Sequence, residues 1–223
     1  MNVFEYVSND KNTMNYLVFY PDDYADLPLI CYLHGAGERG NVLSHLYRHG
    51  IPKLIAEGIE IPAVIVCPQC PTEFVWDNIV VSVKKLIDEI AVKFKIKSDR
   101  ICITGSSMGG YGTWMMGQTY SNYFSAIAPV SGGGMTWRVE KLKTTKIYAV
   151  HGKLDSVIPC FNTEDMINAL KLNNIGAKLL LLEDFGHNDC IDYAYRNTDL
   201  IQWLLAQRRT DFTEVAEVCS EFF

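Results

Sequence analysis

The part of the chain best suited to covalent chemistry is the run GSSMG at residues 105–109. It follows the apolar run ICIT and precedes a helix-forming stretch, so a predicted strand turns into a predicted helix here. A serine in such a turn is held on strained backbone with its hydroxyl above the sheet, where it can attack a substrate. The run therefore predicts a nucleophilic serine, and a glycine-rich turn without chemistry is the alternative.

The glycine spacing distinguishes the two serines of this run. Ser107 has Gly105 two residues before it and Gly109 two residues after it, whereas Ser106 has bulkier residues at both offsets. Glycines at these offsets remove side chains that would collide with neighbouring backbone. Ser107 is therefore the predicted nucleophile.

A serine hydroxyl needs a base, and two histidines follow the nucleophile in the chain. His187 lies in the polar stretch DFGHND after the apolar run KLLLL, where its side chain can reach across the carboxyl ends of the strands. His151 ends the run KIYAV directly before a glycine, a place typical of a structural histidine. Because the base comes last in the order typical of this turn, we predict that His187 is the base.

The base in turn needs a carboxylate that orients its ring and stabilises its cation. The preferred acid is Asp155, in HGKLDSVIP. It follows the run KIYAV, which is the predicted strand before KLLLL. Asp184 and Asp189 are the competitors, but they flank the histidine within its own loop and are better placed to cap or solvate it.

Hydrolysis also needs hydrogen-bond donors for the oxyanion that develops in the transition state. The backbone N–H of Met108, directly after the nucleophile, is the first predicted donor. The second is expected from the glycine-rich run HGAGERG at residues 34–40, and Ala36 is the preferred residue. His34 is interpreted as a brace for this loop.

Three aromatic residues are candidates for the walls of an acyl or alcohol pocket, since they follow a predicted strand end or the elbow: Trp76, Tyr111 and Trp114. Large aromatic side chains belong to the core more often than to a binding site, which is the competing interpretation.

The elements that must position these residues are short apolar runs: YLVFY, LICYL, AVIVC, ICITG, AIAPV, KIYAV and KLLLL. Such runs are typical of parallel strands covered on both faces. Residues 77–94 and 191–208 carry apolar residues at three- and four-residue steps and predict helices, and residues 41–58 predict two short helices because Gly50 and Pro52 interrupt them. The alternation predicts an α/β fold with a doubly wound, mostly parallel sheet.

The 223 residues predict one domain, with a catalytic core at about 14–208 and a tail at 210–223 that covers the core or meets a second subunit in a homodimer. A net charge of −6 disfavours nucleic acid as a partner. No signal-peptide pattern or membrane-spanning run is found, so we expect no membrane association and a cytoplasmic location.

Seven cysteines, an odd number, predict no disulfide framework. Cys67 and Cys70 form a CPQC run that could be a redox pair or half of a zinc site, but no second ligand pair completes it. We therefore expect no metal and no cofactor.

In this order, HGAGERG, HGIPKLIAEG, CPQCP, GSSMGGYGTW, SGGG, HGKLDSVIP and FGH resemble the small bacterial predicted-peptidase or phospholipase/carboxylesterase group of α/β-hydrolases. This group is related to dienelactone hydrolases and to the catalytic domain of prolyl oligopeptidases. The resemblance implies an α/β-hydrolase fold without a large cap. It also places Ser107, Asp155 and His187 at the triad positions and Ala36 and Met108 at the oxyanion positions. Serine in place of the dienelactone hydrolases' cysteine argues against that activity.

These observations predict a serine carboxylic ester hydrolase that forms an acyl-enzyme on a small-molecule ester. Short acyl esters, or carbohydrate or phenolic esters as the resemblance implies, are the expected substrates. A serine peptidase or an acyl thioesterase would use the same triad, and a hydrolase-fold binding protein without turnover is a third possibility.

Overall fold

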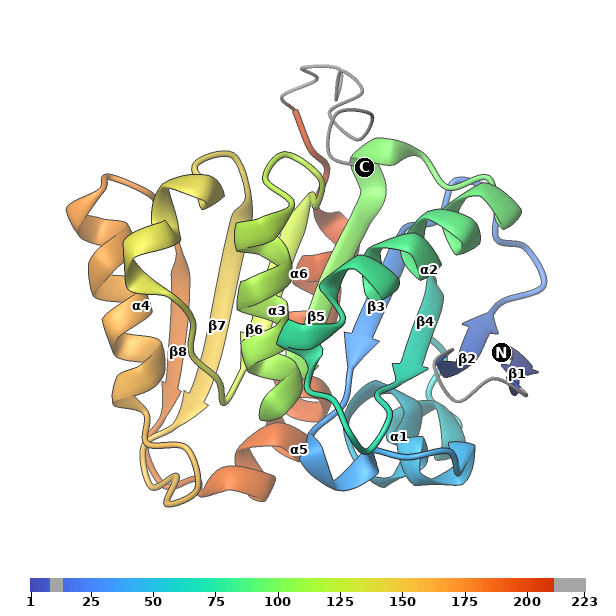
Figure 1. Ribbon diagram of the computed structural model, residues 1–223, viewed down its shortest axis with the longest axis horizontal. Helices are drawn as coiled ribbons and strands as arrows, with labels where there is room; N and C mark the ends of the chain where they lie inside the picture. Colours follow the sequence, from blue (N-terminus) through green and yellow to red (C-terminus); the bar gives the residue numbers. More distant parts are fainter. Residues whose placement is uncertain (9–13, 211–223) are drawn as a thin grey trace.

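The computed structural model describes residues 1–8 and 14–210, which form one eight-stranded sheet flanked by helices (Figure 1). The sheet order is β1-β2-β4-β3-β5-β6-β7-β8. β1 pairs with β2 and β2 with β4 in antiparallel fashion, and the other neighbours are parallel. The strands are β1 (Asn2–Tyr6), β2 (Asn15–Tyr20), β3 (Leu29–Leu33), β4 (Val64–Gln69), β5 (Ile101–Ser106), β6 (Ala126–Val130), β7 (Lys146–Gly152) and β8 (Lys178–Leu182).

All seven apolar runs form strands, as predicted. β3, β4, β5 and β6 are buried at every residue, which explains why their sequences show no alternation of apolar and polar residues. β1 was not predicted. It is exposed at all five of its residues on the edge of the sheet, so burial leaves no pattern in its sequence.

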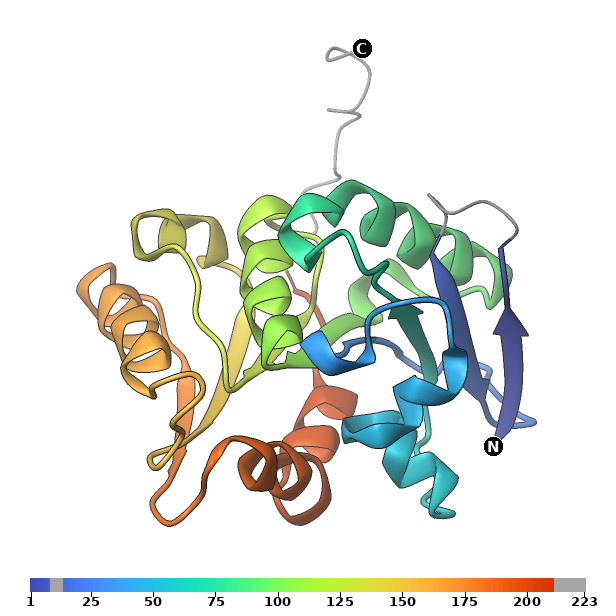
Figure 2. The same cartoon turned by 60° about the horizontal axis from the view of Figure 1, so that its bottom comes forward.

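Helices cover both faces of the sheet, which Figure 2 shows nearly edge-on. One layer contains α2 (Val80–Lys93), α3 (Met108–Thr119) and α4 (Phe161–Leu172), and the other contains α1 (Gly50–Ala56), α5 (His187–Asn197) and α6 (Leu200–Ala206). Each layer closes its own apolar core against the strands. The doubly wound α/β architecture is as predicted.

The predicted helix over 191–208 is instead two helices, α5 and α6. The break lies at Thr198, whose backbone is extended. Its hydroxyl donates a hydrogen bond to the carbonyl of Ala194 and accepts one from the N–H of Leu200. A side chain that bonds nearby backbone in this way competes with helical hydrogen bonds, and the apolar spacing does not reveal it.

The other helices follow the sequence more closely. Residues 41–58 form two short helices, the 3-10 helix η2 (Leu43–Arg48) and α1, as predicted. The predicted helix at 77–94 is α2, preceded by the 3-10 turn η3 (Trp76–Asn78). Further 3-10 helices are η1 (Ala36–Glu38), η4 (Ser98–Arg100) and η5 (Thr136–Leu142).

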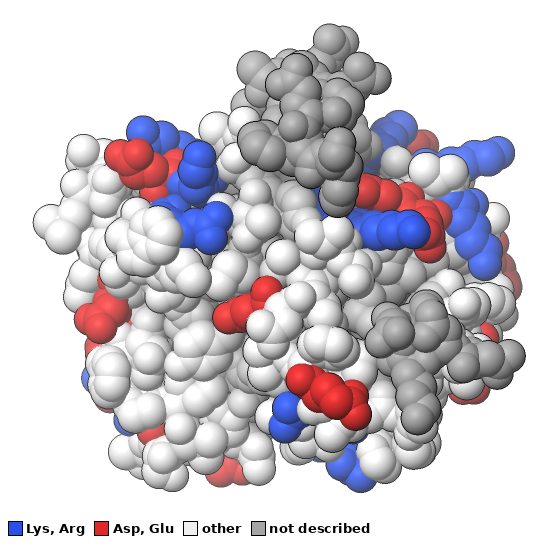
Figure 3. Space-filling model, viewed as in Figure 1, with Lys and Arg blue, Asp and Glu red and all other residues white. Residues whose placement is uncertain are grey.

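Several expectations concern features outside the sheet. The six described cysteines are free thiols, and Cys67 and Cys70 are buried. Within residues 1–8 and 14–210, no group of three metal-ligating side chains is found, and no helix is long and apolar enough to cross a membrane. On the face in Figure 3, lysines and arginines form small separate groups beside acidic residues. The predicted tail lies, from residue 211 onward, outside the described residues.

Candidate active site

Ser107 sits in a sharp turn between β5, which ends at Ser106, and α3, which begins at Met108. Its backbone has a φ of 58°, in the left-handed region that non-glycine residues rarely adopt. A Cβ at Gly109 would lie 1.9 Å from the carbonyl oxygen of Leu33, and one at Gly105 would lie 2.6 Å from the same atom. Both glycines are therefore required by close backbone approach, as predicted.

The neighbouring Ser106 points into the interior. It is buried, and its Oγ lies 3.2 Å from the hydroxyl of Tyr32. Ser107, by contrast, is half-buried, and its Oγ lies 2.9 Å from Nε2 of His187. The structure thus separates the two serines in the way that the glycine spacing predicted.

His187 connects the serine to a carboxylate. It is the first residue of α5, and its Nε2 lies 2.9 Å from Oγ of Ser107. Its Nδ1 lies 2.6 Å from Oδ2 of Asp155. With the proton on Nδ1 donated to the carboxylate, Nε2 is left with the lone pair that accepts the serine proton.

Asp155 is held by the turn that follows β7. Its Oδ1 accepts hydrogen bonds from the N–H groups of Val157 and Ile158, at 2.9 and 2.8 Å. Its side chain is fully buried, so the orientation of the carboxylate is fixed by these bonds and by the bond from His187. Asp184 and Asp189 are exposed. In the described part of the chain, His187 bonds to Asp155 and Ser107 and to neither of these two carboxylates.

His151 lies beneath the same carboxylate and is buried. Its Nε2 is 2.8 Å from the carbonyl oxygen of Ile158 and 3.3 Å from Oδ2 of Asp155, and its Nδ1 is 2.7 Å from Oγ1 of Thr163. Burial lowers the pKa of this histidine. Its contacts brace the Asp155 turn, and they do not include Ser107.

The two predicted oxyanion donors both begin a helix. Ala36 is the first residue of η1 and Met108 the first residue of α3, and the first N–H groups of a helix have no acceptor within it. Two arginines hold the outer side of the loop. Nε of Arg39 donates to the carbonyl of Ala36 at 3.1 Å, and Nη1 of Arg48 donates to the carbonyl of Gly37 at 2.9 Å.

His34 braces the inner side of this loop. Its Nε2 accepts a hydrogen bond from the N–H of Cys70 at 2.9 Å, so the proton lies on Nδ1, which is 2.5 Å from the carbonyl oxygen of Gly35. Burial lowers the pKa of His34 to about 4, which keeps the ring neutral and able to accept at Nε2. The interpretation of His34 as a brace agrees with these contacts.

The three aromatic candidates do not share one environment. Trp76 and Trp114 are 1% and 0% exposed and belong to the core on the α2–α4 face. Their prediction as pocket walls is therefore wrong, and the competing interpretation as core residues describes them. The indole of Trp76 donates to the carbonyl of His34, a contact that helps to hold the oxyanion loop. Tyr111 is half-buried, and its hydroxyl donates to Oδ1 of Asn162.

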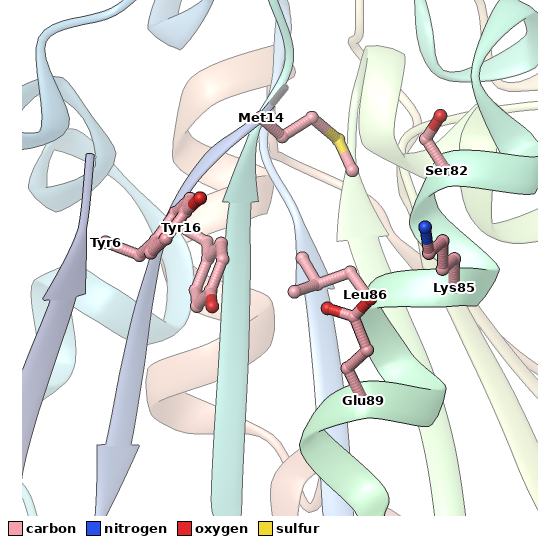
Figure 4. A pocket seen from close by; sticks show the side chains of 7 residues that line it. All are labelled: Tyr6, Met14, Tyr16, Ser82, Lys85, Leu86 and Glu89. Atoms are coloured by element: carbon pink, nitrogen blue, oxygen red, sulfur yellow. The ribbon is translucent and has the colours of Figure 1, made fainter. Parts of the chain in front are cut away.

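A cavity of about 330 Å³ opens beside the nucleophile. Its lining residues are Gly35, Ala36, Gly37, Glu38, Arg48, His49, Ser106, Ser107, His187, Asn188 and Ile191. A second cavity, of about 270 Å³, lies between the β1–β2 edge of the sheet and α2 (Figure 4). Its lining includes the stacked rings of Tyr6 and Tyr16 but no serine–histidine pair.

Residues 69–196, more than half of the chain, match the phospholipase/carboxylesterase family. The chain belongs to this family. It has the α/β-hydrolase fold, as the resemblance implied, and no large cap accompanies the sheet in the described residues.

Known relatives of this carboxylesterase-family chain include esterases. It is 28% identical over 147 residues to the bifunctional acetylxylan esterase/xylanase XynS20E of Neocallimastix patriciarum, a match that covers 63% of this chain and 21% of that protein. It is 35% identical over 52 residues to poly(3-hydroxyalkanoate) depolymerase C of Paucimonas lemoignei, a match that covers 23% of this chain and 13% of that protein. The chain thus spans well under two thirds of either relative.

Solved structures are similar over nearly the whole chain. A thermostable esterase has a TM-score of 0.76 at 27% identity, covering 93% of this chain and 63% of that structure. The feruloyl esterase module of Clostridium thermocellum, solved with sinapinate, has a TM-score of 0.73 at 16% identity, covering 94% and 90%. The second similarity shows the fold alone.

The sequence did not single out the cavity residues of this carboxylesterase-family chain. Glu38, Arg48 and His49 line the cavity together with Ser107, and the first lies inside the HGAGERG loop that the sequence did identify. The signal that could have identified Glu38 was the presence of an acidic residue within a glycine-rich loop. Arg48 and His49 lie at the end of η2 and immediately after it, where no pattern marks them.

Proposed function

We propose that the chain hydrolyses carboxylic esters through an acyl-enzyme, with Ser107 as nucleophile, His187 as base and Asp155 as orienting carboxylate. The observation that carries the proposal is the continuous chain of contacts from Oγ of Ser107 to His187 at 2.9 Å and on to Asp155 at 2.6 Å. Such a chain activates a hydroxyl that is otherwise a weak nucleophile.

In the first half of the reaction, Oγ of Ser107 attacks the ester carbonyl carbon while its proton passes to Nε2 of His187. The carbonyl oxygen becomes an oxyanion within reach of the N–H groups of Ala36 and Met108. Collapse of this intermediate breaks the ester C–O bond, and the leaving alkoxide takes the proton from His187. Water then attacks the acyl-enzyme by the same steps and releases the acid.

The proposed substrates are small esters with short acyl groups, including acyl or phenolic esters of carbohydrates. The names of the acetylxylan esterase and feruloyl esterase relatives support this range. The open cavity of about 330 Å³ beside Ser107 fits a small group of the ester. The residues at about 14–208 would constitute one catalytic domain that needs no cofactor, because the chain supplies the nucleophile, the base and the oxyanion donors.

The test compares short-chain nitrophenyl esters, acyl thioesters and aminoacyl amides, together with labelling by a fluorophosphonate. We expect esters to be turned over fastest and labelling to disappear in Ser107→Ala. Faster turnover of amides or thioesters would replace the esterase proposal with a peptidase or a thioesterase. An unlabelled wild-type protein without turnover would identify a binding protein.

A further inference from the structure

The carboxylate of Glu38 has no role in the chemistry proposed above, yet it is placed beside it. Glu38 ends η1 and is 6% exposed. Among the described residues, none donates a hydrogen bond to its side chain. Its main chain is held, since Nε2 of Gln69 donates to the Glu38 carbonyl at 2.9 Å. The Glu38 side chain also lines the cavity beside Ser107, so a donor that enters this cavity can reach its carboxylate.

The neighbouring basic groups do not compensate this charge. The closest is Nδ1 of His34, 3.8 Å from Oε2, but the proton on Nδ1 is directed at the carbonyl of Gly35 and the buried ring is neutral above a pKa of about 4. The guanidinium groups of Arg39 and Arg48 are bonded to backbone carbonyls of the same loop. Glu38 therefore retains unused acceptor capacity.

That capacity faces the nucleophile. A Cβ built on Gly35 would lie 3.2 Å from Oε2 of Glu38 and 3.5 Å from Cβ of Ser107, so the two side chains border the same small space above Gly35. Both residues also line the cavity of about 330 Å³. A hydrogen-bond donor that lies a few bonds from the ester carbonyl of a substrate bound at Ser107 could therefore reach this carboxylate.

We propose that Glu38 is a specificity-determining residue that accepts a hydrogen bond from a hydroxyl group on the alcohol portion of the ester, next to the scissile bond. The preferred substrates are thus monoesters of diols and polyols. The inference rests on the ester hydrolysis proposed above and adds to it the chemistry of the leaving group.

The cavity belongs to the alcohol side because of His187. The imidazole must return its proton to the leaving oxygen, so the alcohol departs along the side of Ser107 that His187 occupies. The cavity that holds Glu38 is lined by His187 and Asn188 as well. A hydroxyl on the second carbon from the leaving oxygen then lies between the base and the carboxylate.

The first experiment uses the wild-type chain and three acetates of nearly equal size: 2-hydroxyethyl acetate, propyl acetate and 2-methoxyethyl acetate. We expect kcat/KM for the hydroxyethyl ester to exceed the other two by about tenfold, since a hydrogen bond to a charged acceptor is worth about that factor. The methoxy ester can accept but not donate, so it isolates the donor. Equal values for all three would overturn the proposal about Glu38 while leaving ester hydrolysis intact.

The second experiment repeats the comparison in Glu38→Leu, which removes the acceptor, with Glu73→Leu as the control. Glu73 is exposed in the loop before η3 and does not line the cavity, and its substitution removes the same charge. The preference for the hydroxyethyl ester should shrink toward unity in Glu38→Leu and persist in Glu73→Leu. A preference that survives in Glu38→Leu would overturn the proposal. Absence of turnover of all three acetates, with no fluorophosphonate labelling, would overturn the proposed function instead.

Discussion

Nδ1 of His34 lies 2.5 Å from the carbonyl oxygen of Gly35, the residue directly before the proposed oxyanion donor. In a trans peptide the C=O and the following N–H point in opposite directions. By holding the Gly35 carbonyl on the inner side of the loop, His34 therefore directs the N–H of Ala36 the other way. The buried His34 side chain thus fixes the orientation of the proposed oxyanion donor.

Replacing His34 should consequently impair the chemical step more than binding. In His34→Gln we expect kcat for a nitrophenyl ester to fall by about 10- to 100-fold with little change in KM, because a misdirected oxyanion donor loses part of the factor that such a donor contributes. Steady-state kinetics measure this. His45→Gln, on the half-buried η2, is the control and should retain wild-type kcat. A drop confined to KM would contradict the assigned role.

The left-handed backbone of Ser107 predicts a conflict between stability and activity. Its φ of 58° strains any residue with a Cβ. Ser107→Gly should therefore be more stable than Ser107→Ala by about 1 kcal/mol, although both lose activity. Urea unfolding measures the difference. Ser44 is the control, because it is exposed and lies in η2 without a positive φ. At this position glycine has the lower helix propensity, so Ser44→Gly should be less stable than Ser44→Ala.

The contacts of Asp155 predict which acid matters. Asp155→Asn should lower kcat by up to about 10⁴-fold, since the amide can no longer hold the proton of His187 on Nδ1. Asp184→Asn and Asp189→Asn change the same charge near His187 and should remain close to the wild type. Should either of these two show the large loss instead, the role of the carboxylate would move to that residue.

Much of this arrangement could be predicted from the sequence because it depends on local chemistry. Gly105 and Gly109 mark the elbow, and chain order separates His187 from His151. The fate of Trp76 could not be predicted, since a tryptophan after a strand end can face a pocket or the core equally well. In the structure Trp76 packs against Gly112, and a Cβ built on Gly112 would lie 2.6 Å from the Cβ of Trp76. Glu38 was missed for a similar reason, because burial of a loop carboxylate depends on packing between distant segments.

The close backbone contacts predict a sharp difference between two glycines. A Cβ at Gly109 would collide with the carbonyl of Leu33 at 1.9 Å, and backbone cannot move as cheaply as a side-chain end. Gly109→Ala should therefore destabilise the protein severely or prevent folding. Gly37, in the oxyanion loop, has nothing within 4 Å of a built Cβ, and Gly37→Ala should fold normally. Thermal unfolding followed by circular dichroism compares the two variants.

Burial of neutral histidines predicts a loss of stability in acid. The pKa of His34 falls from 6.5 to about 4 on folding, and burial lowers that of His151 in the same direction. Between these pH values the unfolded chain binds a proton that the folded chain does not, so the free energy of unfolding rises with pH there. The contribution of His34 is complete above pH 6.5 and is lost as the pH falls through about 4.

The free energy of unfolding, measured with urea, should fall between pH 7.5 and pH 4. In His34→Gln this fall should be smaller by about 3 kcal/mol, the free energy that corresponds to a pKa shift from 6.5 to about 4. His45→Gln, which removes a half-buried histidine of η2, is the matched control. Identical slopes in the wild type and in His34→Gln would mean that His34 is protonated in the folded protein. Its Nε2 could not then accept the hydrogen bond from Cys70, and the brace on the oxyanion loop would have to be a different one.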